Sequence, residues 1–154
     1  MTMARQAVGL GLGVYVVWLA LAYRYHFIDG VNLLVHEAGH VFFGFLGAVL
    51  GVLGGTLLQL LFPIAFIAYF WRRGQRFEAG VCGVWASESA MYTAEYMADA
   101  QVQALPLVGG HIHDWHWLLS RAGILGACEE LALAVHIMAT LAAISAVWLV
   151  LREA

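Results

Sequence analysis

The stretch NLLVHEAGHVFFGFL, Asn32 to Leu46, places two histidines and a glutamate inside one of the most apolar parts of the chain. An ionised side chain at the centre of a bilayer costs about 2.5–3.5 kcal/mol even on the lenient insertion scale. His36, Glu37 and His40 therefore need partners that offset the cost of burying them in an apolar helix. A metal ion is one such partner, and hydrogen-bonding groups on neighbouring helices are the alternative.

The composition indicates a membrane protein. Of 154 residues, 63% are hydrophobic and 11% are charged, whereas a soluble domain has about half apolar and a quarter charged residues. We therefore expect an all-α, polytopic membrane helix bundle that forms one domain over residues 1–154, is surrounded by lipid, and lies in a bacterial inner membrane. The seven basic residues are all arginines and form no basic run, so nucleic acid is excluded as a partner.

Five apolar segments approach the roughly 20 residues needed to cross a bilayer. They cover residues 6–22, 31–50, 56–71, 79–99 and 124–151. A tight glycine-rich turn is predicted at 51–55, and a short interfacial or re-entrant helix is predicted from Asp114 to Gly123. The arginines of 72–76 place that loop in the cytoplasm, so the N-terminus and the irregular stretch 100–115 are expected on the other side.

His36, Glu37 and His40 form an HExxH motif. On a helix, residues four apart share a face, so both imidazoles can reach one metal ion. Glu37 lies one position further round the helix, where it can take a proton from a water on that metal. The motif predicts a zinc site with His36 and His40 as ligands and Glu37 as the catalytic general base; iron is the less favoured metal.

At HEAGH the chain resembles the intramembrane zinc metalloproteases of the site-two protease type. The resemblance covers about ten residues and implies a zinc-dependent hydrolase, with zinc held by His36 and His40 and Glu37 as general base. It also implies a membrane-protein or peptide substrate. The third ligand in that family is an Asp of an Asp-Gly motif in a separate segment. The Asp29-Gly30 pair of this chain precedes HEAGH instead.

The third ligand is therefore expected elsewhere, and GGHIHDWHW, Gly109 to Trp117, is the densest polar cluster. We favour His113 or Asp114, and the other member can orient a ligand by hydrogen bonding. Either residue reaches His36 only if residues 101–115 fold back into the bundle. The alternatives that stay open are His116, Asp99 and His136.

A second polar pattern lies in segment 79–99, where Glu88, Tyr92, Glu95 and Asp99 follow helical spacing. These side chains are expected to share one face toward the bundle interior. Glu88 and Glu95 then line a path for water or protons, or they make hydrogen bonds between helices. The pattern does not distinguish these two interpretations.

Three classes of function fit the sequence. The first is a zinc-dependent intramembrane hydrolase, specifically a metalloprotease. The second is a small non-catalytic subunit, stabilised by a metal, of a larger membrane complex. The third is a membrane di-iron oxidoreductase, because His36 and His40 also form an HxxxH pair, and Glu37 and His40 form a Glu-x-x-His pair. The paired histidine boxes of that class are absent from the chain.

Overall fold

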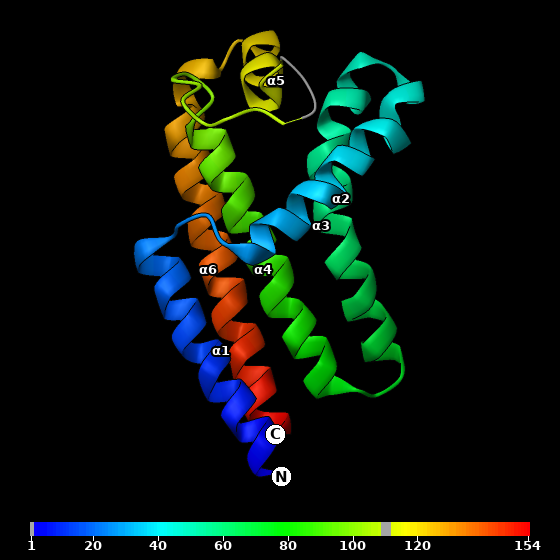
Figure 1. Ribbon diagram of the computed structural model, residues 1–154, viewed down its shortest axis with the longest axis vertical. Helices are drawn as coiled ribbons and strands as arrows, with labels where there is room; N and C mark the ends of the chain where they lie inside the picture. The colour runs from blue at the N-terminus through cyan, green and yellow to red at the C-terminus, as the bar shows by residue number, and fades with distance from the viewer. Residues whose placement is uncertain (1, 109–111) are drawn as a thin grey trace.

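The computed structural model describes residues 2–108 and 112–154, and all regular elements in this part are helical (Figure 1). In chain order they are α1 (Met3–Ala22), α2 (Phe27–Phe43), the 3-10 turn η1 (Gly44–Leu46), α3 (Ala48–Arg72), α4 (Arg76–Ala98), α5 (Asp114–Ala122), the 3-10 turn η2 (Leu125–Ala127) and α6 (Cys128–Glu153). The all-α expectation is confirmed for the described residues.

Helix α4 is the centre of the bundle, with α6 on one side and α3 on the other, while α1 packs on α6 and α2 packs on α3. Small residues allow the close contact between α4 and α6. A Cβ atom added at Gly80 would lie 2.7 Å from the Val150 side chain and 3.2 Å from the Ala146 carbonyl oxygen. This approach fixes α4 against α6 and leaves the opposite face of α4 for the polar groups described below.

Three helical segments are long and apolar enough to cross a membrane: α1, α3 and Leu125–Glu153. Many large apolar side chains on the outside of the bundle are exposed, which suits contact with lipid. The expected number of about five crossings is not confirmed. Helices α2 and α4 are not among these three segments. Helix α2 has only 17 residues, which gives a length of about 26 Å at 1.5 Å per residue, and α4 carries three acidic residues, Glu78, Glu88 and Glu95.

The turn predicted at 51–55 is wrong, because these residues lie inside α3. The chain instead turns at η1, where Gly47 has a φ of 103°, a conformation that favours glycine. The glycines of α3 serve close packing: a Cβ atom at Gly39 of α2 would lie 2.2 Å from the Gly54 carbonyl oxygen. Gly54 therefore lies where the backbones of α2 and α3 touch, and it is not part of a turn.

The N-terminus lies at the same end of the bundle as the α3–α4 loop, so the prediction that it lies on the opposite side from this loop is wrong (Figure 1). Arg5 of α1 forms a 2.7 Å ion pair with Glu78 of α4, and the Thr2 N–H donates to the Ala154 carbonyl oxygen at 3.0 Å. The error follows from counting α2 as a complete crossing, which reverses the direction of α1 relative to the later helices.

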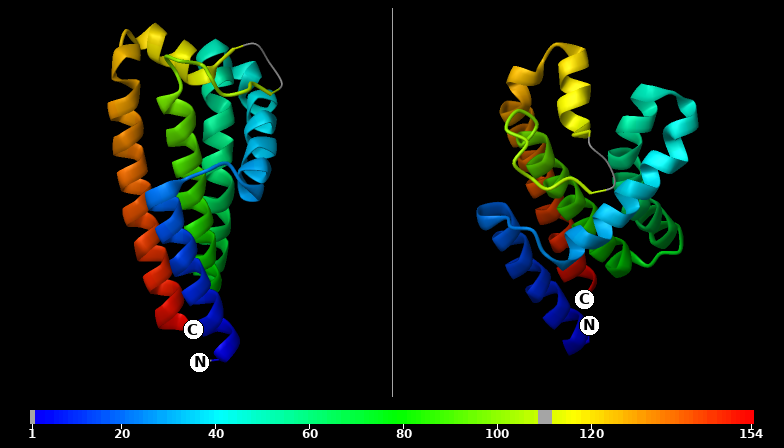
Figure 2. Two further views of the ribbon diagram at one scale, coloured as in Figure 1. Left: turned by 60° about the vertical axis from the view of Figure 1, so that its left-hand side comes forward. Right: turned by 45° about the horizontal axis from the view of Figure 1, so that its top comes forward.

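Helix α5 lies at the opposite end from the two termini in every view (Figures 1 and 2). It begins at Asp114 and stops before Gly123, whose φ of 73° ends the helix, so the predicted bounds are confirmed. The Asp99 carboxylate at the end of α4 accepts the backbone N–H groups of Ala104 and Leu105, at 2.8 and 3.0 Å. These bonds turn the chain after α4 and help return α5 to α3 and α4.

Candidate metal centre

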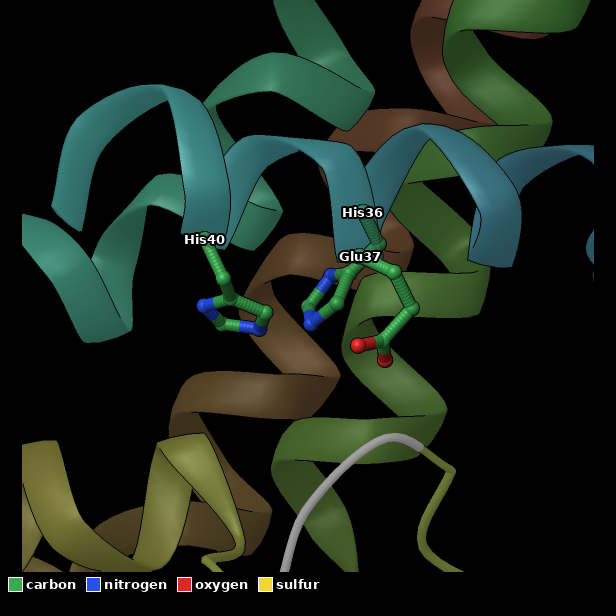
Figure 3. Close-up of side chains that lie close together, drawn as sticks. All are labelled: His36, Glu37 and His40. Carbon is green, nitrogen blue, oxygen red and sulfur yellow. The ribbon is translucent and has the colours of Figure 1, made fainter.

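His36, Glu37 and His40 extend from the same side of α2 (Figure 3). One ligand atom from each residue lies within 4.8 Å of the others. Asp114, the first residue of α5, reaches this cluster from the other side. Its Oδ2 atom lies 2.8 Å from His36 Nε2 and 3.2 Å from His40 Nε2. The segment after α4 therefore does fold back to the HExxH motif.

The protonation of both imidazoles follows from the bonds of their other nitrogen atoms. His40 Nδ1 lies 2.8 Å from the Gly51 carbonyl oxygen, which can only accept, so Nδ1 carries the hydrogen. His36 Nδ1 lies 3.1 Å from Gln59 Oε1. The Gln59 amide nitrogen donates to the Ser89 carbonyl oxygen at 3.0 Å, and this contact fixes Gln59 with its oxygen toward His36.

In the neutral imidazoles, both Nε2 lone pairs therefore point at one carboxylate oxygen of Asp114. Three acceptor atoms this close repel one another unless protons or a metal ion lie among them. Zinc bound by imidazole and carboxylate lies about 2.0–2.2 Å from each ligand atom, which puts neighbouring tetrahedral ligands roughly 3.3 Å apart. The Nε2–Oδ2 distances of 2.8 and 3.2 Å are close to that separation.

The same contacts shift the pKa values of the cluster. Hydrogen bonding to Asp114 raises the pKa of His40 to about 9, although burial acts in the opposite direction. Burial alone would raise the pKa of Asp114, but its contacts with His36 and His40 outweigh burial and lower that pKa. The carboxylate is therefore ionised at neutral pH, as a metal ligand must be.

Two further residues, Tyr96 and Gly55, determine how the ligands are placed. The Asp114 backbone N–H donates to Tyr96 Oη on α4 at 3.0 Å, which anchors the first turn of α5. The Tyr96 ring stacks on His113 with 4.2 Å between centroids. On the α3 side, a Cβ atom at Gly55 would lie 2.5 Å from His36 Nε2, so only a glycine leaves room for this imidazole.

The structure does not bring His113 to the two histidines of α2. His113 precedes α5, accepts the His116 N–H at 3.2 Å, and directs Nε2 toward Asp99 Oδ2 at 3.4 Å. His116 Nδ1 lies 2.8 Å from the Ala100 carbonyl oxygen, and His136 Nε2 lies 3.3 Å from the Ala20 carbonyl oxygen. Among the alternatives for a third ligand, Asp114 is thus the residue in contact with His36 and His40. His111 lies outside the described residues.

A cavity of about 830 Å³ adjoins the cluster, within the range of about 300–1,000 Å³ usual for small-molecule sites. Glu37, Tyr92 and Tyr96 contribute polar groups to its wall, and residues 105–108 with Trp117 contribute apolar surface. Because Glu37 lines the cavity beside His36 and His40, its carboxylate can act on a molecule held there.

The four residues of the polar pattern on α4 lie in four different environments. Glu88 is fully buried, and Tyr92 lines the cavity. Glu95 is exposed, contrary to the prediction that the whole stripe faces the interior, and Asp99 organises the loop after α4. Gln59 and Tyr96, which support the cluster, were not predicted in this role from the sequence. The signal available for Gln59 was a lone amide in the apolar segment 56–71.

Comparisons of the chain with protein-family models, with curated proteins and with solved structures find no match.

Proposed function

We propose that this chain is a multi-pass membrane protein and a zinc-dependent intramembrane hydrolase that cleaves peptide bonds. The observation that carries the proposal is the convergence of His36 Nε2 and His40 Nε2 on Asp114 Oδ2, at 2.8 and 3.2 Å. Glu37, which lies beside His36, His40 and Asp114, supplies the further group that hydrolysis requires, a general base.

In this proposal His36, His40 and Asp114 hold the ion. Zinc bound there would act as a Lewis acid and would lower the pKa of a water toward neutral. The Glu37 carboxylate accepts the proton of the attacking water and passes it to the leaving amine. Tyr96 accepts a hydrogen bond from the Asp114 N–H, so its own hydroxyl hydrogen remains available to a substrate carbonyl in the cavity.

The resemblance to the site-two protease type supports the same ligand set. That family combines the two histidines of HExxH with an aspartate from a separate segment. Asp114 fulfils this requirement from α5, in the sequence HIHD rather than in an Asp-Gly motif. The chain therefore resembles the family in the types of its three proposed ligands, and it differs from the family in the sequence around the aspartate.

The arginine distribution supports an orientation for the bundle. Five of the seven arginines belong to the end that contains the termini and the α3–α4 loop: Arg5, Arg72, Arg73, Arg76 and Arg152. The positive-inside rule assigns this end to the cytoplasm. The metal centre and α5 then lie in the opposite half of the bundle, and substrates reach the cavity from that side or from the membrane.

Metal analysis combined with an activity assay tests the proposal. Zinc is measured by elemental analysis on detergent-purified wild type, His36→Ala and Glu37→Gln, with Glu95→Gln as an exposed control. Cleavage is measured as new amino termini released from a pool of synthetic transmembrane peptides. His36→Ala should contain one zinc fewer than wild type. Glu37→Gln should keep the wild-type zinc content and lose about 10²–10⁴-fold in rate, the usual contribution of a general base.

The alternatives give different results in this experiment. Two irons and no zinc would support the oxidoreductase. One zinc fewer in His36→Ala than in wild type, with no cleavage by wild type, would support the non-catalytic subunit stabilised by a metal. Full activity in Glu37→Gln would refute the assigned base.

A further inference from the structure

A second cluster of ligand-forming side chains lies where the α1–α2 connection meets α4. It consists of His26, Asp29 and Glu88, with one ligand atom from each within 4.8 Å of the others. His26 Nδ1 lies 2.7 Å from Asp29 Oδ2, and His26 Nε2 lies 4.0 Å from Glu88 Oε1. Asp29 and His36 are seven residues apart on α2, roughly 10 Å along the helix axis. The cluster is therefore separate from the candidate metal centre.

The two carboxylates of this cluster are fully buried, each with an exposed fraction of 0%. Within the described residues, their ion-pair contacts are with His26 and none is with an arginine. Asn32 Nδ2 donates to Glu88 Oε2 at 2.8 Å, and the Tyr23 hydroxyl donates to Asp29 Oδ1. These bonds orient the carboxylates, and two adjacent buried carboxylates with His26 as their one ion-pair partner among the described residues are strongly unfavourable unless a proton or a cation lies between them.

One acceptor of the cluster receives no hydrogen bond from a donor in the described part of the chain. Glu88 Oε1 is buried and makes no hydrogen bond to any described group. It faces His26 Nε2 at 4.0 Å, too far for a hydrogen bond. Two ligands of one ion with bonds of about 2.0–2.2 Å can lie up to roughly 4.4 Å apart, so the gap fits a shared cation.

The contacts of His26 Nδ1 determine the protonation of Nε2, the ring nitrogen that faces Glu88. Nδ1 lies 3.1 Å from the Arg24 carbonyl oxygen and 2.7 Å from Asp29 Oδ2, and both oxygens accept, so Nδ1 carries the hydrogen. In the neutral ring Nε2 is then the acceptor, and the Tyr15 hydroxyl contacts it. The lone pair on Nε2, the phenol of Tyr15 and the free oxygen of Glu88 lie on the same side of the imidazole.

We propose that His26, Asp29 and Glu88 bind a second divalent cation of the zinc class, with Tyr15 beside it as an additional oxygen donor. Imidazole suits zinc and related transition metals, and two carboxylates balance the charge of a divalent ion. The proposal does not depend on hydrolysis at the first centre.

The position of this ion gives it a structural role. His26 precedes α2, Asp29 lies in the first turn of α2, and Glu88 lies on α4. Asn32, one turn before His36, joins Glu88 to α2. The ion thus fastens the beginning of the HExxH helix to α4 and fixes the direction from which α2 presents His36 and His40.

Zinc stoichiometry in single and double variants tests the second site. Protein in detergent is equilibrated with buffered Zn²⁺, separated from free ion and analysed for metal. Wild type should hold two zinc ions, Glu88→Gln one, His36→Ala one, and the double variant none. Glu95→Gln, an exposed carboxylate seven residues further along α4, should hold two. Equal zinc content in wild type and Glu88→Gln would overturn the proposal.

A second readout separates metal loss from misfolding. Zinc should raise the melting temperature of His36→Ala by several degrees, because only the second site remains, and should not change that of the double variant. His26→Phe keeps the aromatic contacts of the ring with Trp18 and Tyr23 and should also lose one zinc. Retention of two zinc ions by His26→Phe would contradict the proposal. An unchanged zinc content in His36→Ala alone would instead count against the first centre.

Discussion

Replacing Gln59 by leucine should weaken zinc binding without touching a metal ligand. Gln59 has an exposed fraction of 2% and accepts the His36 Nδ1 hydrogen on Oε1 at 3.1 Å. Its amide nitrogen donates to the Ser89 carbonyl oxygen at 3.0 Å and lies 3.2 Å from Thr93 Oγ1. Leucine fills a similar volume but removes every one of these bonds, and it leaves His36 free to rotate or to change tautomer.

The size of the effect follows from the role of the bond. Losing a hydrogen bond that orients a metal-bound histidine typically lowers metal affinity about 10–100-fold, which corresponds to roughly 1.4–2.7 kcal/mol. The unpartnered His36 Nδ1–H should also destabilise the fold by about 1–3 kcal/mol, whereas the Ser89 carbonyl oxygen still accepts from Thr93 Oγ1 at 3.0 Å. Affinity and melting temperature should therefore fall together.

The assay is competition for Zn²⁺ against a fluorescent chelator, with wild type, Gln59→Leu and Gln59→Glu. A buried glutamic acid at this position is favoured in its neutral form. Its carbonyl can accept from His36 and its hydroxyl can donate to Ser89, so Gln59→Glu should remain within a few-fold of wild type. Equal affinity of Gln59→Leu and wild type would refute the reasoning that this bond positions His36.

Three further predictions concern the same centre. Asp114→Asn should bind one zinc fewer than wild type at micromolar free Zn²⁺ by elemental analysis, because an amide oxygen does not supply the charge of the carboxylate; full occupancy would contradict this ligand. Gly55→Ala should weaken zinc binding at least about tenfold, since the new Cβ would lie 2.5 Å from His36 Nε2; Gly11→Ala, where the Cβ meets open space, is the control. Because the pKa of His40 is raised to about 9, its imidazole is protonated below that pH and must lose the proton to bind zinc. Zinc affinity should therefore increase as pH rises from 7 to 9, and calorimetry in buffers of different ionisation enthalpy should detect proton release at pH 7; binding without proton release would oppose this assignment.

Long apolar runs between charged residues were sufficient to predict most of the helices. The segments predicted at 6–22, 79–99 and 124–151 correspond to α1, α4 and α6. Prediction failed at Gly51–Gly55, since glycine favours both a turn and the close approach of two helices. The choice depends on Gly39, which lies in another helix and packs directly on the α3 backbone. The sequence of residues 51–55 alone cannot predict this contact with another helix.

The histidine pair of the site could be predicted because a helix brings residues four apart to one face. The third partner could not be fixed in the same way, since His113, Asp114 and His116 all lie within four residues of the chain. Tyr96 selects among them by accepting the backbone N–H of Asp114. The supporting bonds from Gln59 and the Gly51 carbonyl oxygen likewise arise only when α3 packs on α2.

The separation of 78 residues between His36 and Asp114 has a consequence for biosynthesis. The ribosome makes α2, α3 and α4 before it reaches the carboxylate, and chains fold from the N-terminus as they are made. A nascent chain at that stage therefore contains His36, Glu37 and His40 without the Asp114 carboxylate. On the proposed assignment, the site gains its third ligand, and with it hydrolytic competence, only when α5 docks.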